Sequence, residues 1–368
     1  MSSERLPETA QDVCIVLLTG LGDVIHGLPV ANALKRDQPT RRITWVVEPM
    51  PAPIVEEHPA VDDVVVYEKS RGAAGVVDLW RKLGSRELDV TLNLNVYFKA
   101  VWPMLFSGAP VRIGFDRDRA RDLTWLAATD RLPRRRRSHT QDMFLEFLDY
   151  LDVQPHPLEW RLQPTRAEQA EQARFFRRFR RPVAAVVPAS ANPKKDWTAE
   201  RWAGVLDALD ADFGFDTLLL GGPSEREQAL TRDILEAAAT PPVVAMGDGI
   251  RPLLWRLHGS ALLVAPDTGP VHMARAMDVP VIGLYGHTNP WRVGPYRRYR
   301  DLWVDAYTEP DEPPDPSNAT PKLGRMERIT VADVLERVHV AVDRYGALKR
   351  APGAGGDYTS LDPYSREG

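Results

Sequence analysis

Apolar and polar residues alternate along the chain in blocks that predict strands and helices in turn. Short apolar runs bounded by polar turns are typical of strands that are buried on both faces. Such runs occupy residues 13–18, 43–47, 64–66, 90–94, 111–113, 183–187, 217–220, 243–245, 262–265 and 281–285. Helical patterns separate most of these runs, and that alternation predicts parallel sheets with right-handed crossovers.

The helical patterns and a proline-rich segment divide this series into two halves. We expect helices at residues 76–83, 99–106, 140–151, 167–180, 199–212, 252–258 and 331–345, besides one that ends near residue 35. Residues 154–164 hold three prolines and predict a connection between domains. The expected domains are therefore residues 1–160 and 161–330, followed by a C-terminal helix at 331–348. Residues 1–11 and 349–368 are expected to be disordered.

Each half begins with a strand and a polar turn, which suggests two Rossmann-like α/β domains that face a central cleft. The length of 368 residues and a hydrophobic content of 43% suit two such cores. Cys14 is the single cysteine and lies in an apolar run, so we expect a core residue in a reducing cytoplasm. We expect neither a membrane span nor a signal peptide. A net charge of −4 gives no indication of a nucleic-acid partner.

A turn in the second half carries the strongest candidate chemistry. The strand at 262–265 leads into Asp267-Thr268-Gly269-Pro270 and then a helical pattern. Pro270 suits a first helical position, and the Thr268 side chain could cap the helix. Unpaired N–H groups and the positive end of the helix dipole favour a phosphate at this place. The alternative is an ordinary capped helix without a ligand.

A second candidate turn follows the first strand. Gly20 and Gly22 permit a tight turn and close backbone approach before Asp23. Asp23 is either a functional carboxylate or an acid favoured by the helix dipole. Asn93 and Asn95 end another strand, where they either bind a sugar or cap the turn.

Basic residues are concentrated between Arg112 and Arg137 and end in a run that includes Arg134 and Arg135. A charge run of this kind is either simply solvated or meets the anionic groups of lipids and acidic glycans. His139 opens the helix at 140–151, where we expect it to mark the helix end without a catalytic role.

Three phrases together resemble the donor signature of the heptosyltransferase family, glycosyltransferase family 9. They are D-T-G-P-V-H-M-A-R-A-M at 267–277, P-V-I-G-L-Y-G at 280–286 and T-N-P-W-R-V-G-P-Y at 288–296. The phrase L-L-T-G-L-G-D at 17–23 is similar to the N-terminal signature of the same family, although Thr19-Gly20 replaces its usual polar pair. The resemblance implies the GT-B architecture and transfer of heptose from ADP-heptose to the inner core of lipopolysaccharide.

The resemblance also implies roles for individual residues. Asp23 would be the catalytic base of an inverting reaction, and Lys195 in P-K-K-D-W would contact the donor phosphates in preference to Lys194. The expected donor-binding set is Ser190, Lys195, Glu225, Asp267, Thr268, Gly269, Pro270 and His272, with Glu225 at the ribose. The expected acceptor-binding set is Gly22, Asn93, Arg134 and Arg135. We expect no metal and no cofactor, because Lys195 and a helix N-terminus can neutralise the diphosphate and the D-A-D phrase at 210–212 falls in a helix.

The expected partners are a nucleotide sugar, a lipid-linked acidic acceptor and the anionic inner membrane, on whose cytoplasmic face the protein would lie peripherally. Two alternatives stay open at this stage. One is an enzyme of the same scaffold that uses another nucleotide sugar or acceptor. The other is a protein that binds a nucleotide sugar without transferring it.

Overall fold

The computed structural model describes residues 10–355 and divides the chain into two compact units, Met1–Arg161 and Leu162–Gly368, here called unit 1 and unit 2. Each unit contains one six-stranded sheet in which all pairs of strands are parallel. The division lies one residue from the expected boundary at 160/161.

The first strand of the unit 1 sheet is formed by the first apolar run of the sequence. Its strands and helices are β1 (Asp12–Leu17), α1 (Leu21–Asp37), β2 (Arg42–Val47), α2 (Ala52–Glu56), β3 (Asp63–Val66), α3 (Ala73–Gly84), β4 (Val90–Asn93), α4 (Val101–Phe106), β5 (Val111–Gly114), β6 (Asp130–Arg131) and α5 (Thr140–Tyr150). Single 3₁₀ turns η1 (Lys69–Arg71), η2 (Phe98–Ala100) and η3 (Thr124–Leu126) interrupt the loops. The strand order is β3-β2-β1-β4-β5-β6.

Unit 2 repeats this plan of alternating strands and helices. It comprises α6 (Arg166–Phe176), β7 (Val183–Val186), η4 (Pro193–Lys195), α7 (Ala199–Ala211), β8 (Asp216–Gly221), α8 (Glu225–Ala237), β9 (Val243–Met246), α9 (Ile250–His258), β10 (Leu262–Pro266), α10 (Gly269–Ala276), β11 (Val281–Tyr285), α11 (Pro290–Val293), η5 (Arg300–Leu302), β12 (Trp303–Asp305), η6 (Arg325–Arg328), α12 (Val331–Tyr345) and η7 (Ala347–Lys349). The strand order is β12-β11-β10-β7-β8-β9.

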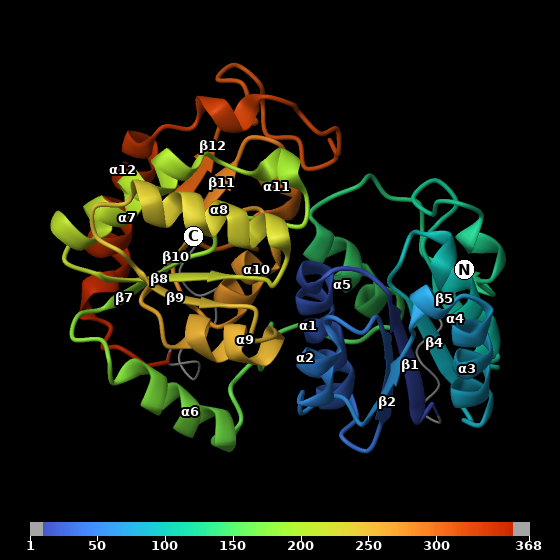
Figure 1. Ribbon diagram of the computed structural model, residues 1–368. Coiled ribbons are helices and arrows are strands. Elements are labelled where there is room, and N and C mark those ends of the chain that lie inside the picture. Colours follow the sequence, from blue (N-terminus) through green and yellow to red (C-terminus); the bar gives the residue numbers. More distant parts are fainter. Residues whose placement is uncertain (1–9, 356–368) are drawn as a thin grey trace. The chain divides into compact units, whose positions relative to one another are not determined.

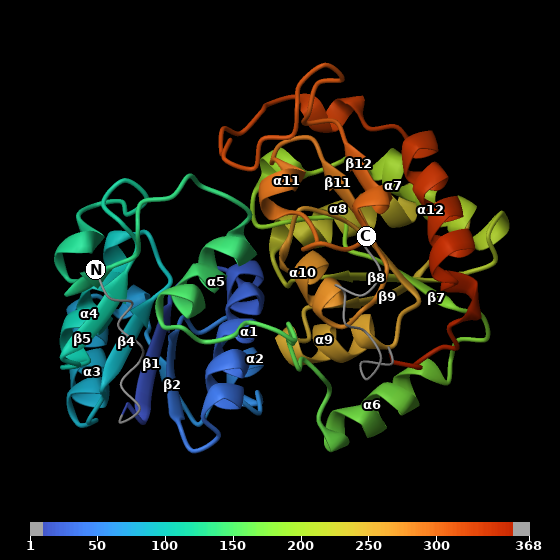
Figure 2. The ribbon, with the colours of Figure 1, turned by 180° about the vertical axis from the view of Figure 1, so that it is seen from behind.

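Both sheets therefore have the strand order of a Rossmann fold, counted from the first strand of each unit. Helices cover both faces of each sheet: α1 and α5 oppose α3 and α4 in unit 1, and α7, α8 and α12 oppose α9 and α10 in unit 2 (Figures 1 and 2). Because both faces are covered, the central strands are apolar on both sides, as their continuous runs predict. Cys14 of β1 is fully buried, and burial raises the pKa of its thiol to about 12.

The end of one helix and the extent of both expected disordered termini differ from the predictions. Helix α6 ends at Phe176, four residues before the expected end, and the chain then turns so that Phe179 packs against Phe175 and Phe176. The start of the expected disordered tail is packed, since the Gly353 N–H donates to the carbonyl of residue 259 at 2.9 Å.

At the other end of the chain, Ala10 is buried, and the Gln11 N–H donates to Asp89 at 2.7 Å. The expected disorder was therefore too long at both ends. The rest of the two segments expected to be disordered, residues 1–9 and 356–368, lies outside the described residues.

Candidate functional site

The expected donor-binding residues lie at the carboxyl edge of the unit 2 sheet. Ser190 and Lys195 follow β7, and Asp267 follows β10. The strand order reverses between these two neighbouring strands, and ligands of such sheets bind beside that point. The topology therefore brings Lys195 and Asp267 together although 72 residues separate them.

Lys195 and Asp267 form the centre of the candidate site. The Lys195 ammonium donates to Asp267 Oδ2 at 2.6 Å and to the Asp267 carbonyl at 3.1 Å. The Thr288 hydroxyl donates to the same carboxylate oxygen at 2.8 Å, and His272 Nε2 lies 3.9 Å from the other oxygen. Lys194 is exposed and makes its contact through its backbone, donating to Asn192 at 3.1 Å. The geometry thus favours Lys195 over Lys194 as the lysine of this site.

The charge of Asp267 is maintained by its neighbours. Burial by itself would raise the pKa of the Asp267 carboxyl, whose side chain is only 10% exposed. The positive charge of Lys195, the His272 ring, and the hydrogen bonds from Lys195 and Thr288 outweigh burial, so the pKa is lowered. Asp267 is therefore an anion that holds the Lys195 ammonium in place. Two of the three N–H groups of that ammonium bond to Asp267, which leaves one to meet a ligand.

The loop that carries Lys195 is anchored on one side by Trp197. The Trp197 indole N–H donates to the carbonyl of Ile329 at 3.1 Å, and the ring packs edge-on against Trp202 with centroids 5.1 Å apart. Thr198 caps α7 by accepting the N–H of Arg201. The tryptophan of the K-x-W phrase therefore stabilises the loop, while the lysine faces the site.

The other side of the loop is held by Arg226 from α8. Its guanidinium donates to the Ser190 carbonyl and to the Asp196 carboxylate. The buried Ser190 hydroxyl accepts the N–H of Asn192 at 3.2 Å and lies 3.0 Å from the carbonyl of that residue. Ser190 thus shapes the turn before Lys195.

The start of α10 differs from the prediction in two respects. Pro270 is the second residue of the helix instead of the first, because the helix begins at Gly269, and the Thr268 side chain makes no capping hydrogen bond. Thr268 has an extended backbone with φ −155° and ψ 164°, and its carbonyl accepts the N–H of Val271 at 3.1 Å. The expected side-chain cap is therefore wrong, and the first N–H groups of α10 are left to other partners.

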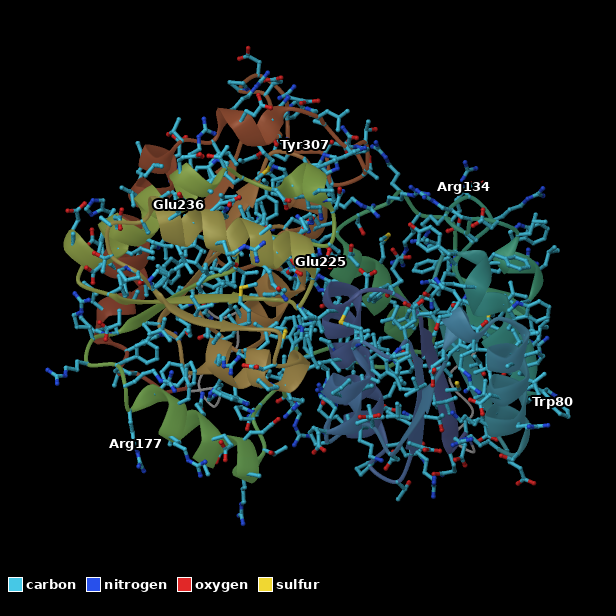
Figure 3. The ribbon with its side chains drawn as sticks, in the orientation of Figure 1. Trp80, Arg134, Arg177, Glu225, Glu236 and Tyr307 are labelled. Atoms are coloured by element: carbon cyan, nitrogen blue, oxygen red, sulfur yellow. The ribbon has the colours of Figure 1, made fainter. Side chains whose placement is uncertain are left out.

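Glu225 is the first residue of α8 and is exposed (labelled in Figure 3). The sequence S-E-R-E at 224–227 has the spacing of a capping box, but only half of that motif forms: Ser224 caps this helix through the N–H of Glu227 at 3.3 Å. Glu227 accepts the N–H of Gly222 at 3.0 Å instead of that of Ser224. The acid that shapes this turn is Glu227, which leaves the Glu225 carboxylate in solvent.

In unit 1 the corresponding edge of the sheet holds Asp23. This half-buried residue is the third of α1, which follows β1 at the point where the strand order reverses towards β4. The neighbouring Gly22 is also half-buried, and a Cβ atom added at Gly20 would meet nothing within 4 Å. The space beside the Gly20 backbone, in the turn before Asp23, is therefore open.

Asn93 and Asn95 cap the turn after β4. Asn95 donates to the Val16 carbonyl at 2.8 Å and accepts the Leu18 N–H at 3.1 Å, and its own N–H donates to Asn93 Oδ1 at 3.0 Å. Both asparagines are 2% exposed. Of the two alternatives for this pair, the structure shows the turn cap.

His139 is the N-cap of α5, because its Nδ1 accepts the Gln141 N–H at 3.1 Å. Gln141 in turn joins α5 to α1, where its side chain bonds to the His26 ring at 3.1 Å and the His26 carbonyl at 2.8 Å. His139 thus acts at the helix end, as predicted.

The arginines between Arg112 and Arg137 differ in their surroundings. Arg119 is buried and donates to both oxygens of Glu146 at 2.9 and 2.8 Å, so it belongs to the core. Arg134 projects from the surface (Figure 3) and pairs with Asp118, and Arg135 lies 3.2 Å from Asp149. All four of these paired side chains are at least half exposed, and such pairs contribute little to stability.

Several residues of the site were not among those predicted from the sequence. Thr288 and His287 follow β11, and the His287 ring lies 3.0 Å from the carbonyl of Lys322 and 3.4 Å from the Asn192 side chain. Thr288 is the first residue of the T-N-P-W-R-V-G-P-Y phrase, so its place in the family signature could have identified it as a site residue. Nothing in the sequence pattern indicates that Arg226 supports Ser190, because that contact depends on how α8 packs.

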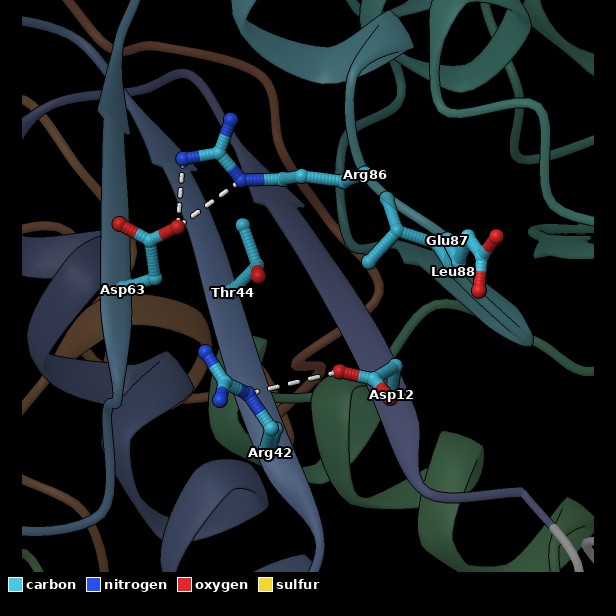
Figure 4. Close-up of a pocket in the computed structure, with 7 residues that line it drawn as sticks. All are labelled: Asp12, Arg42, Thr44, Asp63, Arg86, Glu87 and Leu88. Atoms are coloured by element: carbon cyan, nitrogen blue, oxygen red, sulfur yellow. Dashed lines mark hydrogen bonds and ion pairs between the residues drawn. The ribbon is translucent and has the colours of Figure 1, made fainter.

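Two pockets open at the opposite, amino-terminal edges of the sheets. The pocket in unit 1, of about 350 Å³, is lined by charged groups that pair with one another, including Arg86 with Asp63 and Arg42 with Asp12 (Figure 4). The pocket in unit 2, of about 470 Å³, is lined by Arg181 and its partner Asp216, among others. Ligands of these folds bind at carboxyl edges, so we assign no substrate to either pocket.

A family model described as glycosyltransferase family 9 (heptosyltransferase) matches residues 76–312, well over half of the chain. The chain belongs to glycosyltransferase family 9. Lipopolysaccharide core heptosyltransferase OpsX of Haemophilus influenzae is 29% identical over 303 residues, which cover 82% of this chain and 86% of that protein. Lipopolysaccharide heptosyltransferase 1 of Pseudomonas aeruginosa is 28% identical over 310 residues, covering 78% and 81%.

Solved structures of family 9 show the same architecture. The crystal structure of a family 9 glycosyl transferase from Veillonella parvula matches with a TM-score of 0.76 at 23% identity, covering 92% of this chain and 99% of that one. Escherichia coli heptosyltransferase WaaC with ADP matches with a TM-score of 0.70 at 22% identity, covering 90% and 99%. The predicted GT-B fold class is therefore confirmed, and this member of family 9 is a glycosyltransferase.

Two further properties belong to residues 10–355 of this family 9 member. In that range no helix is both long and apolar enough to cross a bilayer. Within the same residues, no three histidine, cysteine, aspartate or glutamate side chains are grouped so that they could hold a metal ion.

Proposed function

We propose that this glycosyltransferase is an inverting heptosyltransferase that moves heptose from ADP-heptose to an acidic, lipid-linked acceptor of the lipopolysaccharide inner core. The observation that carries the proposal is the Lys195–Asp267 pair, 2.6 Å apart, beside the start of α10. The names of the two similar heptosyltransferases, and the ADP that accompanies WaaC in its solved structure, support the same donor and acceptor classes.

The diphosphate of the donor would bind at the carboxyl edge of the unit 2 sheet. Lys195 offers a fixed ammonium, and Thr268 and Gly269 offer backbone N–H groups at the positive end of the α10 dipole. His272, in the first turn of α10, would contact the phosphate or the sugar. These groups would stabilise the negative charge that develops on the leaving group, which is where electrostatic stabilisation contributes most. We propose on this basis that turnover needs no divalent metal.

We propose Asp23 as the base of the transfer. The acceptor hydroxyl oxygen would attack the anomeric carbon while its proton passes to the Asp23 carboxylate. The bond from that carbon to the diphosphate oxygen would break at the same time, so that the electron pair leaves with ADP. Attack on the face opposite the leaving group inverts the anomeric configuration. General-base assistance of this kind contributes roughly 10²–10⁴-fold to the rate.

The other proposed contacts follow from the sequence signatures. Glu225, in solvent at the start of α8, would receive the ribose hydroxyls, with Ser190 and Pro270 shaping the donor turns. The acidic acceptor would meet Gly22 near Asp23 and the exposed Arg134 and Arg135. The protein would work at the cytoplasmic face of the inner membrane, with no nucleic-acid partner. Asn93 is a weaker candidate for the acceptor, since its amide oxygen already binds Asn95.

Titration calorimetry with ADP, UDP and GDP tests the donor, followed by a transfer assay with ADP-heptose and a lipopolysaccharide acceptor that lacks heptose. ADP should bind most tightly, and the assay should release ADP. A preference for UDP or GDP would point to another nucleotide sugar on the same scaffold. Tight ADP-heptose binding without any transfer would identify a binding protein and overturn the proposed activity.

A further inference from the structure

One part of unit 1 exposes large apolar side chains that the proposed chemistry does not use. They are Tyr97 at 41% exposure, Phe98 at 47%, Trp102 at 37%, Leu105 at 47%, Leu123 at 58% and Leu126 at 62%. We call these six residues the apolar rim. Side chains of this size that are exposed together mark interaction surfaces more often than single exposed residues do.

The apolar rim joins two segments of the chain into one surface. The turn before η3 rests on the segment before η2, because the Arg121 N–H and the Thr124 hydroxyl both donate to the carbonyl of Val96, at 2.6 and 3.0 Å. The Arg121 guanidinium lies over the Tyr97 ring, 5.5 Å from its centroid. These contacts hold the segment that carries Leu123 and Leu126 against the segment that carries Tyr97 and leads into η2.

The same face of η2 and α4 carries the other members. Phe98 and Trp102 are in edge contact with ring centroids 6.4 Å apart, and Leu105 follows Trp102 by three residues. Residues three or four apart lie on one side of a helix. The opposite side of α4, with Met104, is buried.

Leu123 is held in solvent by an unusual backbone. Its φ of 63° is in the left-handed region, which leucine rarely adopts, and the preceding Asp122 has a φ of 52°. Folding gains little from a leucine here, because more than half of its surface is exposed. Strained positions that the core does not require are typical of functional surfaces.

The charges around the apolar rim indicate the kind of partner. The guanidinium groups of Arg117 and Arg131 both lie over the Trp125 ring, 4.8 and 5.5 Å from its centroid. Residues 97–137 hold ten lysines and arginines and four aspartates, a net charge of +6 in a chain whose total is −4. Apolar tips beside guanidinium groups match a bilayer with anionic headgroups, where hydrocarbon lies just below phosphate.

We propose that the apolar rim inserts into the surface of an anionic bilayer, with Leu123 and Leu126 as the deepest residues. The inference rests on the proposed function in one respect, because a lipid-linked acceptor is what places the enzyme at a membrane. It assigns the docking to the apolar rim, whereas the exposed arginines from Arg134 onward add attraction at longer range. Such attraction is screened by salt, but insertion of apolar side chains is not.

The test is co-sedimentation of the full chain with vesicles that contain neither donor nor acceptor. Vesicles of phosphatidylglycerol with phosphatidylcholine are compared with vesicles of phosphatidylcholine alone, at about 0.1 M and 1 M salt, where the Debye length is about 10 and 3 Å. The main variant is Leu123→Asn, because asparagine accepts the left-handed backbone better than leucine. The matched control is Val244→Ser in unit 2, which removes an aliphatic side chain of 43% exposure.

Leu123→Asn should lower partitioning into anionic vesicles about tenfold, and Leu123→Asn with Leu126→Asn roughly a hundredfold. The melting temperature of Leu123→Asn should equal or exceed that of the wild type, which excludes unfolding as the cause. Val244→Ser should bind like the wild type, and binding of the wild type should weaken at 1 M salt without disappearing.

Wild-type binding by the double variant would overturn the proposal, as would binding of the wild type that vanishes completely at 1 M salt. No binding to any vesicle would also overturn it and leave the surface to a protein partner. Failure of the proposed function is distinguishable, because turnover is measured separately on an acceptor stripped of its acyl chains. A double variant that keeps this turnover but loses vesicle binding supports the apolar rim as a docking surface alone.

Discussion

Replacing Lys195 with methionine should separate the two roles of the ion pair, one in folding and one in donor binding. The change leaves the Asp267 carboxylate, 10% exposed, with the Thr288 hydroxyl but without its lysine. Removing one partner of a buried ion pair costs about 3–5 kcal/mol. Asp267 keeps its hydrogen bond from Thr288, and the Lys195 side chain is 18% exposed, so we expect a loss of unfolding free energy at the low end of this range, about 3 kcal/mol. For a unit of this size that lowers the melting temperature by about 6–12 °C.

The double variant Lys195→Met with Asp267→Asn should restore stability without restoring donor binding. The asparagine is neutral and still accepts the Thr288 hydroxyl, so the unfolding free energy should return to within about 1 kcal/mol of the wild type. Donor binding still lacks a charge-assisted hydrogen bond of about 1.5–3 kcal/mol, so ADP should bind roughly 10–150-fold more weakly in both variants. Denaturant unfolding measures the first quantity, and calorimetry with ADP at a temperature where all variants are folded measures the second.

The pH dependence supplies an independent check of the same pair. Because Lys195 lowers the pKa of Asp267 in the folded protein, the pair stabilises the fold above the carboxyl pKa of the unfolded chain. That stabilisation is lost as the pH falls through the lowered pKa. In Lys195→Met, burial becomes the dominant influence and the pKa of Asp267 should rise. The difference in melting temperature between wild type and variant should therefore narrow in acid.

The matched control is Lys194→Met, since Lys194 is the exposed neighbour in the same 3₁₀ turn. It should change neither stability nor ADP affinity. The reasoning would be refuted if Lys195→Met bound ADP as tightly as the wild type, or if Asp267→Asn failed to recover the stability lost in Lys195→Met.

Two further predictions concern the chemistry. Asp23→Asn keeps the shape of the side chain and removes its basicity, so kcat should fall by roughly 10²–10⁴-fold with little change in ADP affinity; a kcat within a few-fold of the wild type would leave Asp23 as an acid favoured by the dipole of α1. Turnover should persist in EDTA, because Lys195 and the start of α10 can neutralise the diphosphate; activity that EDTA abolishes and Mg²⁺ restores would contradict this.

The sequence alone determined the architecture because the signals that predict it are local. Apolar runs such as residues 13–18 and 262–265 indicate strands buried on both faces, and the intervening helical periods require parallel crossovers. The predicted strands all appear within one or two residues of their observed bounds, whereas the short β6 and α2 carry too few residues to form a pattern. The segments with functional signatures were also visible, since Asp23, Lys195 and Asp267 each follow a predicted strand.

Tertiary structure decided which of the candidate side chains meet. Lys194 and Lys195 are neighbouring lysines, and the hydrophobic pattern around them does not distinguish one from the other. In the folded loop, which Trp197 and Arg226 hold in place, Lys195 is the lysine that bonds to Asp267. Asn95 could have faced a sugar, yet the pairing of β1 with β4 places the Val16 carbonyl of β1 and the N–H of Leu18, the residue after β1, within its reach.

The physical reason is that hydrogen bonds and ion pairs act over about 3 Å. The order of the strands, which brings residues 72 positions apart to one edge of a sheet, therefore decides which groups they join. The periodicity of the sequence indicates on which face of its helix or strand a residue lies, but not which residue of another element it contacts.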